Sequence, residues 1–186
     1  MRRWMMSAIM VGVISASVCA ATAADFADDF STCTWSEWKA EKAVAELVHN
    51  PTVGNKAPGA LGITVGPGNP LGAGCCFVRH FSIEPGRTYT ALVYVRGKGL
   101  APDSRVAIGF QGQDAKKRFL GTGVQKALLQ GEAVPTGGWK RIVLSFIIPQ
   151  TGKWEKAALL LCTLAVSNAT SGQVFFDDFE FFQAEE

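Results

Sequence analysis

One stretch near the middle of the sequence constrains the fold more than any other. An apolar run over residues 75–83 is followed by Glu84-Pro85-Gly86-Arg87, and a second alternating run continues over residues 88–96. Proline followed by glycine suits the two central positions of a type II turn, because proline presets φ at the first position and glycine accepts a positive φ at the second. The stretch therefore predicts two strands that reverse direction through a tight turn.

The second of these strands has two chemically different faces, because residues two apart in a strand share a face. One face carries an apolar set that we expect to face the core: Tyr89, Ala91, Val93 and Val95. The other face carries an amphipathic set that suits a binding surface: Thr90, Leu92, Tyr94 and Arg96.

Short apolar segments separated by turns also make up the rest of the chain. It holds 20 glycines and eight prolines, and no segment shows sustained helical periodicity. We expect about ten strands, and the further ones cover residues 26–35, 43–48, 60–65, 105–111, 118–120, 139–148, 157–166 and 173–182. Residues 43–48 are the only segment that also suits a short helix. This pattern predicts an all-β sandwich or barrel.

The first 24 residues have the order of an export signal rather than of a folded segment. Arg2-Arg3 gives a positive start, an apolar run covers residues 4–18, and small residues occupy positions 21–24. The run is too short for a comfortable membrane span. We expect cleavage after Ala23 or Ala24, one domain over residues 25–186, and a secreted or periplasmic product without membrane insertion.

The charge balance argues against a polyanionic partner. Cleavage removes two of the 18 basic residues, which leaves 16 basic and 16 acidic residues in a formally neutral product. No basic segment remains that would attract nucleic acid or an anionic membrane surface, so we expect neither partner. The sequence does not define the oligomeric state.

The cysteines leave two alternatives open. A lipoprotein signal would use Cys19, but Val18 stands where such signals keep a small residue, so this alternative is the weaker one. Four cysteines follow the signal: Cys33, Cys75, Cys76 and Cys162. In an exported chain they predict up to two disulfides, with three possible connectivities, and buried free thiols are the alternative. Zinc is not expected, because adjacent cysteines do not have the spacing of a zinc knuckle.

Four segments occur in an order and spacing that match a known family. They are FADDFS at residues 26–31 with a tryptophan soon after, IEPGRTYT at 83–90, Trp139 before a strand that ends at a proline, and GQVFFDDFEF at 172–181. With these segments the chain resembles the carbohydrate-binding modules of families four and nine, within the galactose-binding-like jelly rolls. The resemblance covers nearly all of residues 25–186. The opening segment also occurs in concanavalin-like sandwiches, a rival fold of the same class.

This resemblance implies a two-sheet antiparallel β-sandwich, a jelly roll, that binds a polysaccharide or oligosaccharide without catalysis. The alternatives are a small jelly-roll glycoside hydrolase or polysaccharide lyase, and a non-sugar adhesion or assembly domain, since a fold does not determine a function. A catalytic acid pair is not expected, because Asp177 and Asp178 are adjacent on a predicted strand and should point to opposite faces.

Jelly rolls of this type often hold a structural calcium ion where the first and last strands meet. The resemblance implies such a site here, with one aspartate of each of two pairs turned inward: Asp28 and Asp29 in the first strand, and Asp177 and Asp178 in the last. Carboxylates completed by backbone carbonyls are the oxygen ligands that calcium prefers. The alternative is a solvated acidic edge that discourages aggregation.

Aromatic rings are the natural contacts for a sugar, because a flat ring packs against the C–H face of a pyranose. Trp38 and Trp139 match family positions that are usually in the core, so we expect neither in the site. The ligand-binding residues that we expect are Trp35, Tyr94 and Trp154 for stacking, with Arg96, Gln111, Gln113 and Asp114 for hydrogen bonding.

Overall fold

The computed structural model describes residues 25–184, apart from the side chains of residues 122–125. The predicted signal, residues 1–24 with Cys19, therefore lies outside the described residues. Eleven strands and two 3-10 helices make up the ordered elements of the described part. No helix in this part of the chain has the length and apolar character needed to cross a membrane.

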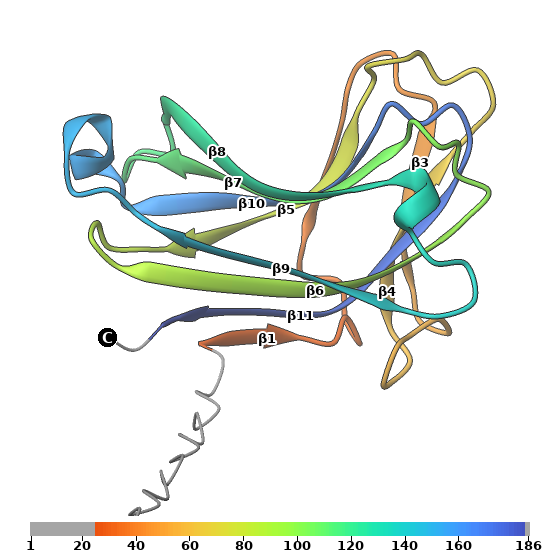
Figure 1. The fold of residues 1–186 in the computed structure, drawn as a ribbon, viewed down its shortest axis with the longest axis horizontal. Coiled ribbons are helices and arrows are strands. Elements are labelled where there is room, and N and C mark those ends of the chain that lie inside the picture. Colours follow the sequence, from red (N-terminus) through yellow and green to blue (C-terminus); the bar gives the residue numbers. More distant parts are fainter. Residues whose placement is uncertain (1–24, 185–186) are drawn as a thin grey trace, which may run out of the picture.

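The strands form two sheets that pack face to face (Figure 1). One is six-stranded, in the order β3-β4-β11-β6-β9 with β1 paired to β11. Its strands are β1 (Phe26–Asp28), β3 (Ala45–Asn50), β4 (Ala60–Val65), β6 (Thr88–Lys98), β9 (Lys140–Ile147) and β11 (Gly172–Gln183). The other is five-stranded, in the order β2-β5-β10-β7-β8. Its strands are β2 (Ser36–Lys39), β5 (Cys75–Ser82), β7 (Arg105–Gln113), β8 (Phe119–Gln130) and β10 (Leu159–Ser167).

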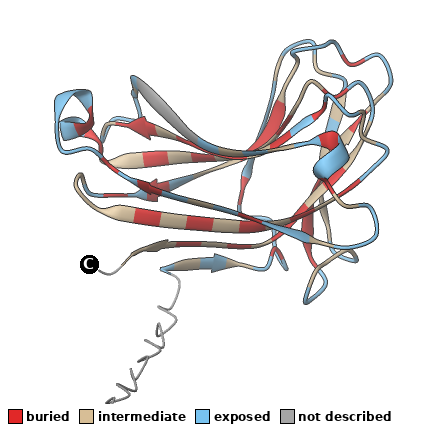
Figure 2. Cartoon of the chain, viewed as in Figure 1, coloured by how far each residue is buried: buried red, intermediate tan, exposed pale blue. Residues whose placement is uncertain are grey.

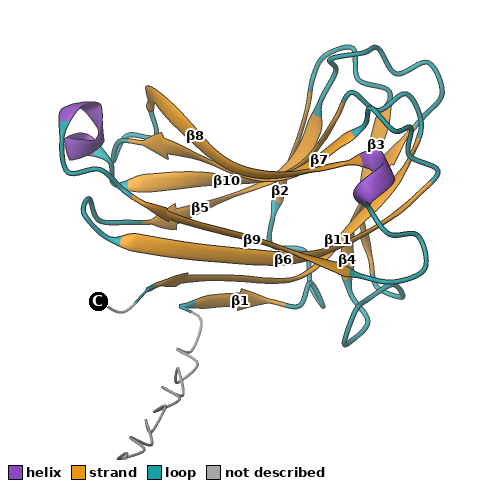
Figure 3. Cartoon of the chain, viewed as in Figure 1, coloured by secondary structure: helices purple, strands orange, loops and turns teal. Residues whose placement is uncertain are grey.

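Every strand pair in the described part is antiparallel, which confirms the predicted two-sheet antiparallel β-sandwich. The 3-10 helices η1 (Gly131–Ala133) and η2 (Gly152–Lys156) lie in connections at opposite ends of the sandwich (Figure 3). Residues 43–48, the one segment that also suited a helix, fall mostly within strand β3.

The Pro85-Gly86 turn forms as predicted. Gly86 has a φ of 87°, and the Arg87 N–H lies 3.4 Å from the Glu84 carbonyl oxygen, as a type II turn requires. The strands on either side, β5 and β6, belong to different sheets and do not pair with each other. The turn therefore carries the chain from one layer of the sandwich to the other.

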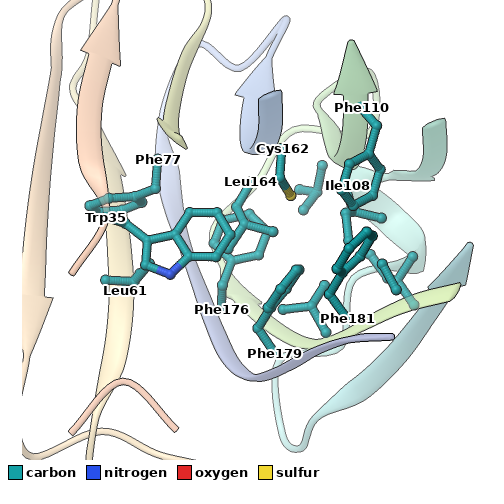
Figure 4. Close-up of a cluster of buried hydrophobic side chains, with 14 of the residues drawn as sticks. Trp35, Leu61, Phe77, Ile108, Phe110, Cys162, Leu164, Phe176, Phe179 and Phe181 are labelled. Carbon is teal, nitrogen blue, oxygen red and sulfur yellow. The ribbon is translucent and has the colours of Figure 1, made fainter. Parts of the chain in front are cut away.

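The core fills the space between the two sheets, and buried positions alternate along the central strands β6 and β10 (Figure 2). The predicted core face of β6 is confirmed, because Tyr89, Ala91, Val93 and Val95 are all buried. Large side chains from both sheets meet in the centre (Figure 4): Trp35, Leu61, Phe77, Ile108, Phe110, Leu164, Phe176, Phe179 and Phe181. This dense apolar layer fixes which side chains point outward.

Two predicted strands have different limits in the structure. Strand β1 ends at Asp28 rather than continuing to residue 35, because Phe30 has a positive φ of 50° and its N–H bonds the Asp28 carboxylate. Strand β8 runs from Phe119 to Gln130, whereas the apolar pattern predicted only residues 118–120. Its glycines and polar residues give this edge strand a weak sequence signal.

The predicted disulfides are not formed. All four described cysteines are free thiols, with Cys33 exposed and the other three buried. Strand alternation turns Cys75 toward the core and Cys76 away from it, so these neighbours face opposite sides of the sheet. Burial raises the pKa of Cys75 to about 11 and that of Cys76 to about 12, which keeps both protonated and unreactive at neutral pH.

Candidate functional site

The outer face of the five-stranded sheet is a surface of small residues between larger ones. Cross-strand pairing sets side chains in rows that run from β2 to β8. One row consists of Trp38, Cys76, Ala165, Ala107 and Leu128, and the next of Ser36, Val78, Thr163, Gly109 and Lys126. We call this outer face the trough.

The middle of the trough is low because its central strands carry small side chains. Ala165, Ala107 and Gly109 occupy β10 and β7, whereas Trp38 on β2 is 55% exposed and Leu128 on β8 is 38% exposed. The strands of this sheet are also bowed, so that the connections at both ends rise beside it (Figure 1). The outer face therefore has small side chains along its central strands and an exposed tryptophan on the edge strand β2.

Polar groups and a second aromatic ring continue the trough toward one end of the sheet. One row there includes His80, Leu161 and Gln111, and the next consists of Ser82, Leu159, Gln113 and Phe119. Phe119 is 59% exposed, whereas Gln113 is buried. The Gln113 Oε1 atom has no hydrogen-bond partner among the described residues, so it is a buried acceptor facing the trough side of its strand.

A pocket lies at each end of strands β7 and β8. The pocket beyond Phe119 has a volume of about 530 Å³ and is lined by Asp114, Arg118, Phe119, Leu120, Gly152, Lys153 and Lys156. The pocket at the opposite end has a volume of about 460 Å³ and is lined by Leu71, Pro102, Asp103, Arg105, Gln130, Glu132 and Asn168. The two pockets therefore lie at opposite ends of strands β7 and β8.

The predicted ligand-binding residues divide between the two sheets. Gln111 and Gln113 lie on the trough, and Asp114 lines the pocket beyond Phe119. Tyr94 and Arg96 lie on the predicted amphipathic face of β6, but that face is the outer side of the six-stranded sheet. The two groups therefore cannot form one site, because the whole sandwich lies between them.

On the six-stranded sheet, the predicted pair Tyr94 and Arg96 makes cation–π contacts. The Arg96 guanidinium lies 5.0 Å from the Trp139 ring centroid and 5.6 Å from the Phe175 ring centroid. The Lys56 ammonium lies 5.7 Å from the Tyr94 ring centroid. Each of these three rings therefore has a cation near one of its faces.

The structure reverses the predicted roles of three tryptophans. Trp35 is 5% exposed and Trp154 is 8% exposed, so neither ring is available for stacking on a sugar. Trp35 belongs to the core, with its ring centroid 5.0 Å from that of Phe179, and Trp154 packs where a side chain on Gly112 would otherwise lie. Trp38, which was expected in the core, is exposed on the trough rim.

The acidic corner lies on the other sheet, where β11 bulges. The pairing of β11 with β6 slips between Asp177 and Glu180, and Asp178 has a positive φ of 46°. The backbone N–H of Asn55 bonds the Asp177 carboxylate, and the Asn55 side-chain amide bonds that of Asp178. The prediction that the two aspartates point to opposite faces is therefore wrong, because the extra residue of the bulge turns both toward one loop.

Asp177 carries a buried negative charge. The residue is 1% exposed, and no Lys or Arg forms an ion pair with it in the described part of the chain. Burial raises its pKa to about 6, and the charges of Asp178 and Asp29 also raise it, against hydrogen bonds from the backbone of Asn55 and Asp178. A buried carboxylate among other carboxylates favours a bound cation or a proton.

Asp28 has a different role from the one predicted. Its carboxylate accepts hydrogen bonds from the Phe30 N–H, the Thr34 hydroxyl and the Trp35 indole, and lies 3.9 Å from the Arg79 guanidinium. It thus organises the loop after β1. Within the described residues, no three His, Cys, Asp or Glu side chains gather closely enough to hold a metal ion, so the four predicted aspartates do not form one ligand set.

The protein is similar to known proteins in its fold but not in its sequence. No family model matches the sequence, and no curated protein matches it significantly. The xylan-binding CBM22-1 domain of Paenibacillus barcinonensis Xyn10C is similar in structure with a TM-score of 0.56 and 13% identity, over 90% of this chain and 99% of that one. The module TmCBM61, solved with β-1,4-galactotriose, has a TM-score of 0.51 and 16% identity, over 84% of this chain and 91% of that one.

An enzyme is also among the similar structures. The enzymatically active domain of tailspike protein 4 from bacteriophage CBA120 has a TM-score of 0.59 and 15% identity over 81% of this chain. This chain spans only 19% of that structure. Carbohydrate-binding modules of families 4 and 11 share the fold as well, so the similar structures cross several families. The described part of this chain is therefore an all-β two-sheet sandwich of the kind found in carbohydrate-binding modules.

Proposed function

We propose that this chain is an exported, non-catalytic protein that binds a polysaccharide or oligosaccharide along the trough. The observation that carries the proposal is the trough itself: a floor of small residues with exposed rings, Trp38 and Phe119, at its margins. The similar structures support it, because most of those described above are carbohydrate-binding modules.

Some residues of the trough would stack on the sugar, and others would form hydrogen bonds with its hydroxyl groups. The Trp38 ring would pack on the C–H face of a pyranose. The small side chains on the central strands would let the glycan approach the sheet closely. His80 and Gln111 would take sugar hydroxyls along the floor. We expect micromolar to millimolar affinity, about −4 to −8 kcal/mol, because a sugar exchanges many water hydrogen bonds for protein ones.

The absence of an acid pair supports a binding role over a catalytic one. Among the described side chains that alternation places on the trough, none is Asp or Glu. Glycoside hydrolysis ordinarily needs two carboxyl groups about 5 to 10 Å apart across the scissile bond. An array of glycans tests the proposal, and product analysis after long incubation with each bound glycan detects any hydrolase or lyase activity.

We also propose that the acidic corner binds calcium, with Asp177 and Asp178 as the carboxylate ligands and backbone carbonyl oxygens completing the set. The buried Asp177 charge without a cationic partner supports this proposal. Bound calcium would neutralise the repulsion among Asp177, Asp178 and Asp29. It would thereby fix the bulge of β11 against the loop around Asn55.

Calcium should raise the free energy of unfolding by about 2.7 kcal/mol when its concentration is a hundredfold above Kd. This gain should be smaller at pH 5 than at pH 7.5, because Asp177, with a pKa of about 6, takes up a proton that competes with the metal. In chelator, stability should instead rise as the pH falls from about 6 toward 4, because the folded-state pKa lies above the ordinary value of 3.8.

Thermal unfolding at both pH values, with calcium and with chelator, measures these effects. Asp177→Asn should remove the calcium shift, whereas Asp103→Asn, which changes an exposed aspartate in the turn before β7, should keep it. A wild-type melting temperature that is the same in calcium and in chelator at pH 7.5 would refute the metal proposal.

A further inference from the structure

Positive charge accumulates in the pocket beyond Phe119. Its lining includes three cationic side chains, Arg118, Lys153 and Lys156, and one acidic side chain, Asp114. The pocket at the opposite end has Arg105 against Asp103 and Glu132. The two ends of the trough therefore have opposite net charge, although basic and acidic residues almost balance over the whole chain.

The single carboxylate of this pocket is already neutralised. Arg118 contacts Asp114 through Nε at 2.7 Å and through Nη2 at 2.6 Å, and its backbone N–H also bonds the same carboxylate. These bonds hold the pKa of Asp114 below its ordinary value. Lys153 and Lys156 form no ion pair with any described residue, and Glu155 between them does not line the pocket. Two uncompensated ammonium groups are therefore left facing the space.

The backbone that carries the two lysines is anchored. Between them, Trp154 is buried against Gly112 of β7, and the Ala158 N–H donates to the Gln113 carbonyl oxygen. The ammonium of Lys153 lies 3.6 Å from the position that a Cβ on Gly121 would occupy, so it lies against strand β8. Figure 3 shows η2 standing beside the end of the five-stranded sheet. The backbone that carries both lysines is thus held beside the end of the sheet.

An aromatic ring and a buried acceptor accompany the two charges. Phe119 is 59% exposed and lines the same pocket. Gln113 pairs with Phe119 across β7 and β8, and its Oε1 atom is buried without a hydrogen-bond partner among the described residues. An exposed ring for stacking and two cations for an anionic substituent together match one ligand class: a sugar residue that carries negative charge.

We propose that the glycan bound in the trough is anionic, and that Lys153 and Lys156 bind the carboxylate of a uronic acid residue stacked on Phe119. This proposal rests on the proposed function and adds to it the charge of the ligand. Sulfated sugars present the same negative charge to the lysines, so the experiment includes both kinds. The remaining, neutral sugar residues of the glycan would lie along the trough toward Trp38.

The test compares each acidic polysaccharide with a neutral counterpart of the same backbone. The probes are polygalacturonate, alginate and glucuronoxylan with their carboxyl-reduced forms, and heparin with its desulfated form, titrated at about 50 and 500 mM salt. We expect tighter binding of at least one carboxylate form than of its reduced form, with a difference that shrinks at high salt. Lys153→Ala/Lys156→Ala should weaken that binding about fivefold at low salt and leave the reduced form unaffected.

The double variant Lys42→Ala/Lys98→Ala is the matched control, because it removes two exposed positive charges outside this pocket. Equal binding of charged and neutral forms would overturn the anionic ligand and leave the proposed function standing. The anionic ligand would likewise be overturned, and the proposed function left standing, if the control variant Lys42→Ala/Lys98→Ala weakens binding as much as Lys153→Ala/Lys156→Ala does. Preference for heparin alone would assign the pocket to sulfate rather than carboxylate. Binding of no glycan of either kind would overturn the proposed function as well.

Discussion

Trp35→Ala should lower the free energy of unfolding by about 3 to 5 kcal/mol, which is the range for removing a large aromatic side chain from a core. The Trp35 ring contacts three other rings, with centroids at 5.0 Å for Phe179, 5.9 Å for Phe30 and 6.3 Å for Phe81. Its indole N–H also bonds Asp28, so the variant would leave a cavity and a carboxylate with one donor fewer.

Trp38→Ala is the matched control for this prediction, because Trp38 is three residues away and 55% exposed. It should change the free energy of unfolding by less than about 1 kcal/mol, as expected for a surface position. Chemical denaturation of both variants measures the difference. Equal destabilisation by the two substitutions would contradict the assignment of Trp35 to the core and Trp38 to the surface.

Trp38→Ala should weaken glycan binding at least about fivefold while the fold stays intact. The exposed ring stands at the rim of the trough beside Cys76, in a row that continues through Ala165 and Ala107 and has no other aromatic side chain among the described residues. Truncation of a stacking aromatic commonly costs about 1 to 3 kcal/mol of binding free energy. Isothermal titration with the glycan that binds most strongly on an array measures this loss.

Tyr94→Ala gives the comparison for that prediction, because it removes an aromatic ring from the outer face of the other sheet. It should leave glycan affinity within about twofold of the wild type. If Tyr94→Ala abolishes binding and Trp38→Ala does not, the site lies on the six-stranded sheet beside Arg96, and the trough is not the binding face.

The alternation of side chains was predictable from sequence wherever a strand stays regular. In β6, the buried set beginning at Tyr89 and the outward set containing Tyr94 are both as expected, because a strand has a period of two residues. The partners of a strand were not predictable in the same way. The residues Pro85-Gly86 predict a reversal of direction. They do not determine whether β5 and β6 form hydrogen bonds within one sheet or lie in two sheets that pack face to face, because that depends on the other strands of the sandwich.

Side-chain directions at the candidate site were predicted wrongly where a loop or a bulge interrupts the two-residue alternation of a strand. The loop after Asp28 breaks the first predicted strand, and a new strand starts at Ser36. Trp35 therefore enters the core from a loop, and Trp38, which the family resemblance placed in the core, points outward from the new strand. The bulge at Asp178 adds one residue to β11, and one extra residue leaves no mark in an apolar pattern. The trough itself combines residues from five strands, and no local motif records which strands become neighbours.

The most direct test of the trough is to locate the glycan on the protein by the shifts of backbone amide resonances during titration. Binding along the trough should move the amide signals of Ala107, Gly109 and Thr163, on the central strands of the five-stranded sheet, and leave those of Leu92 and Tyr94 in place. Shifts confined to β6 and β9, with the central strands of the trough unaffected, would contradict the account.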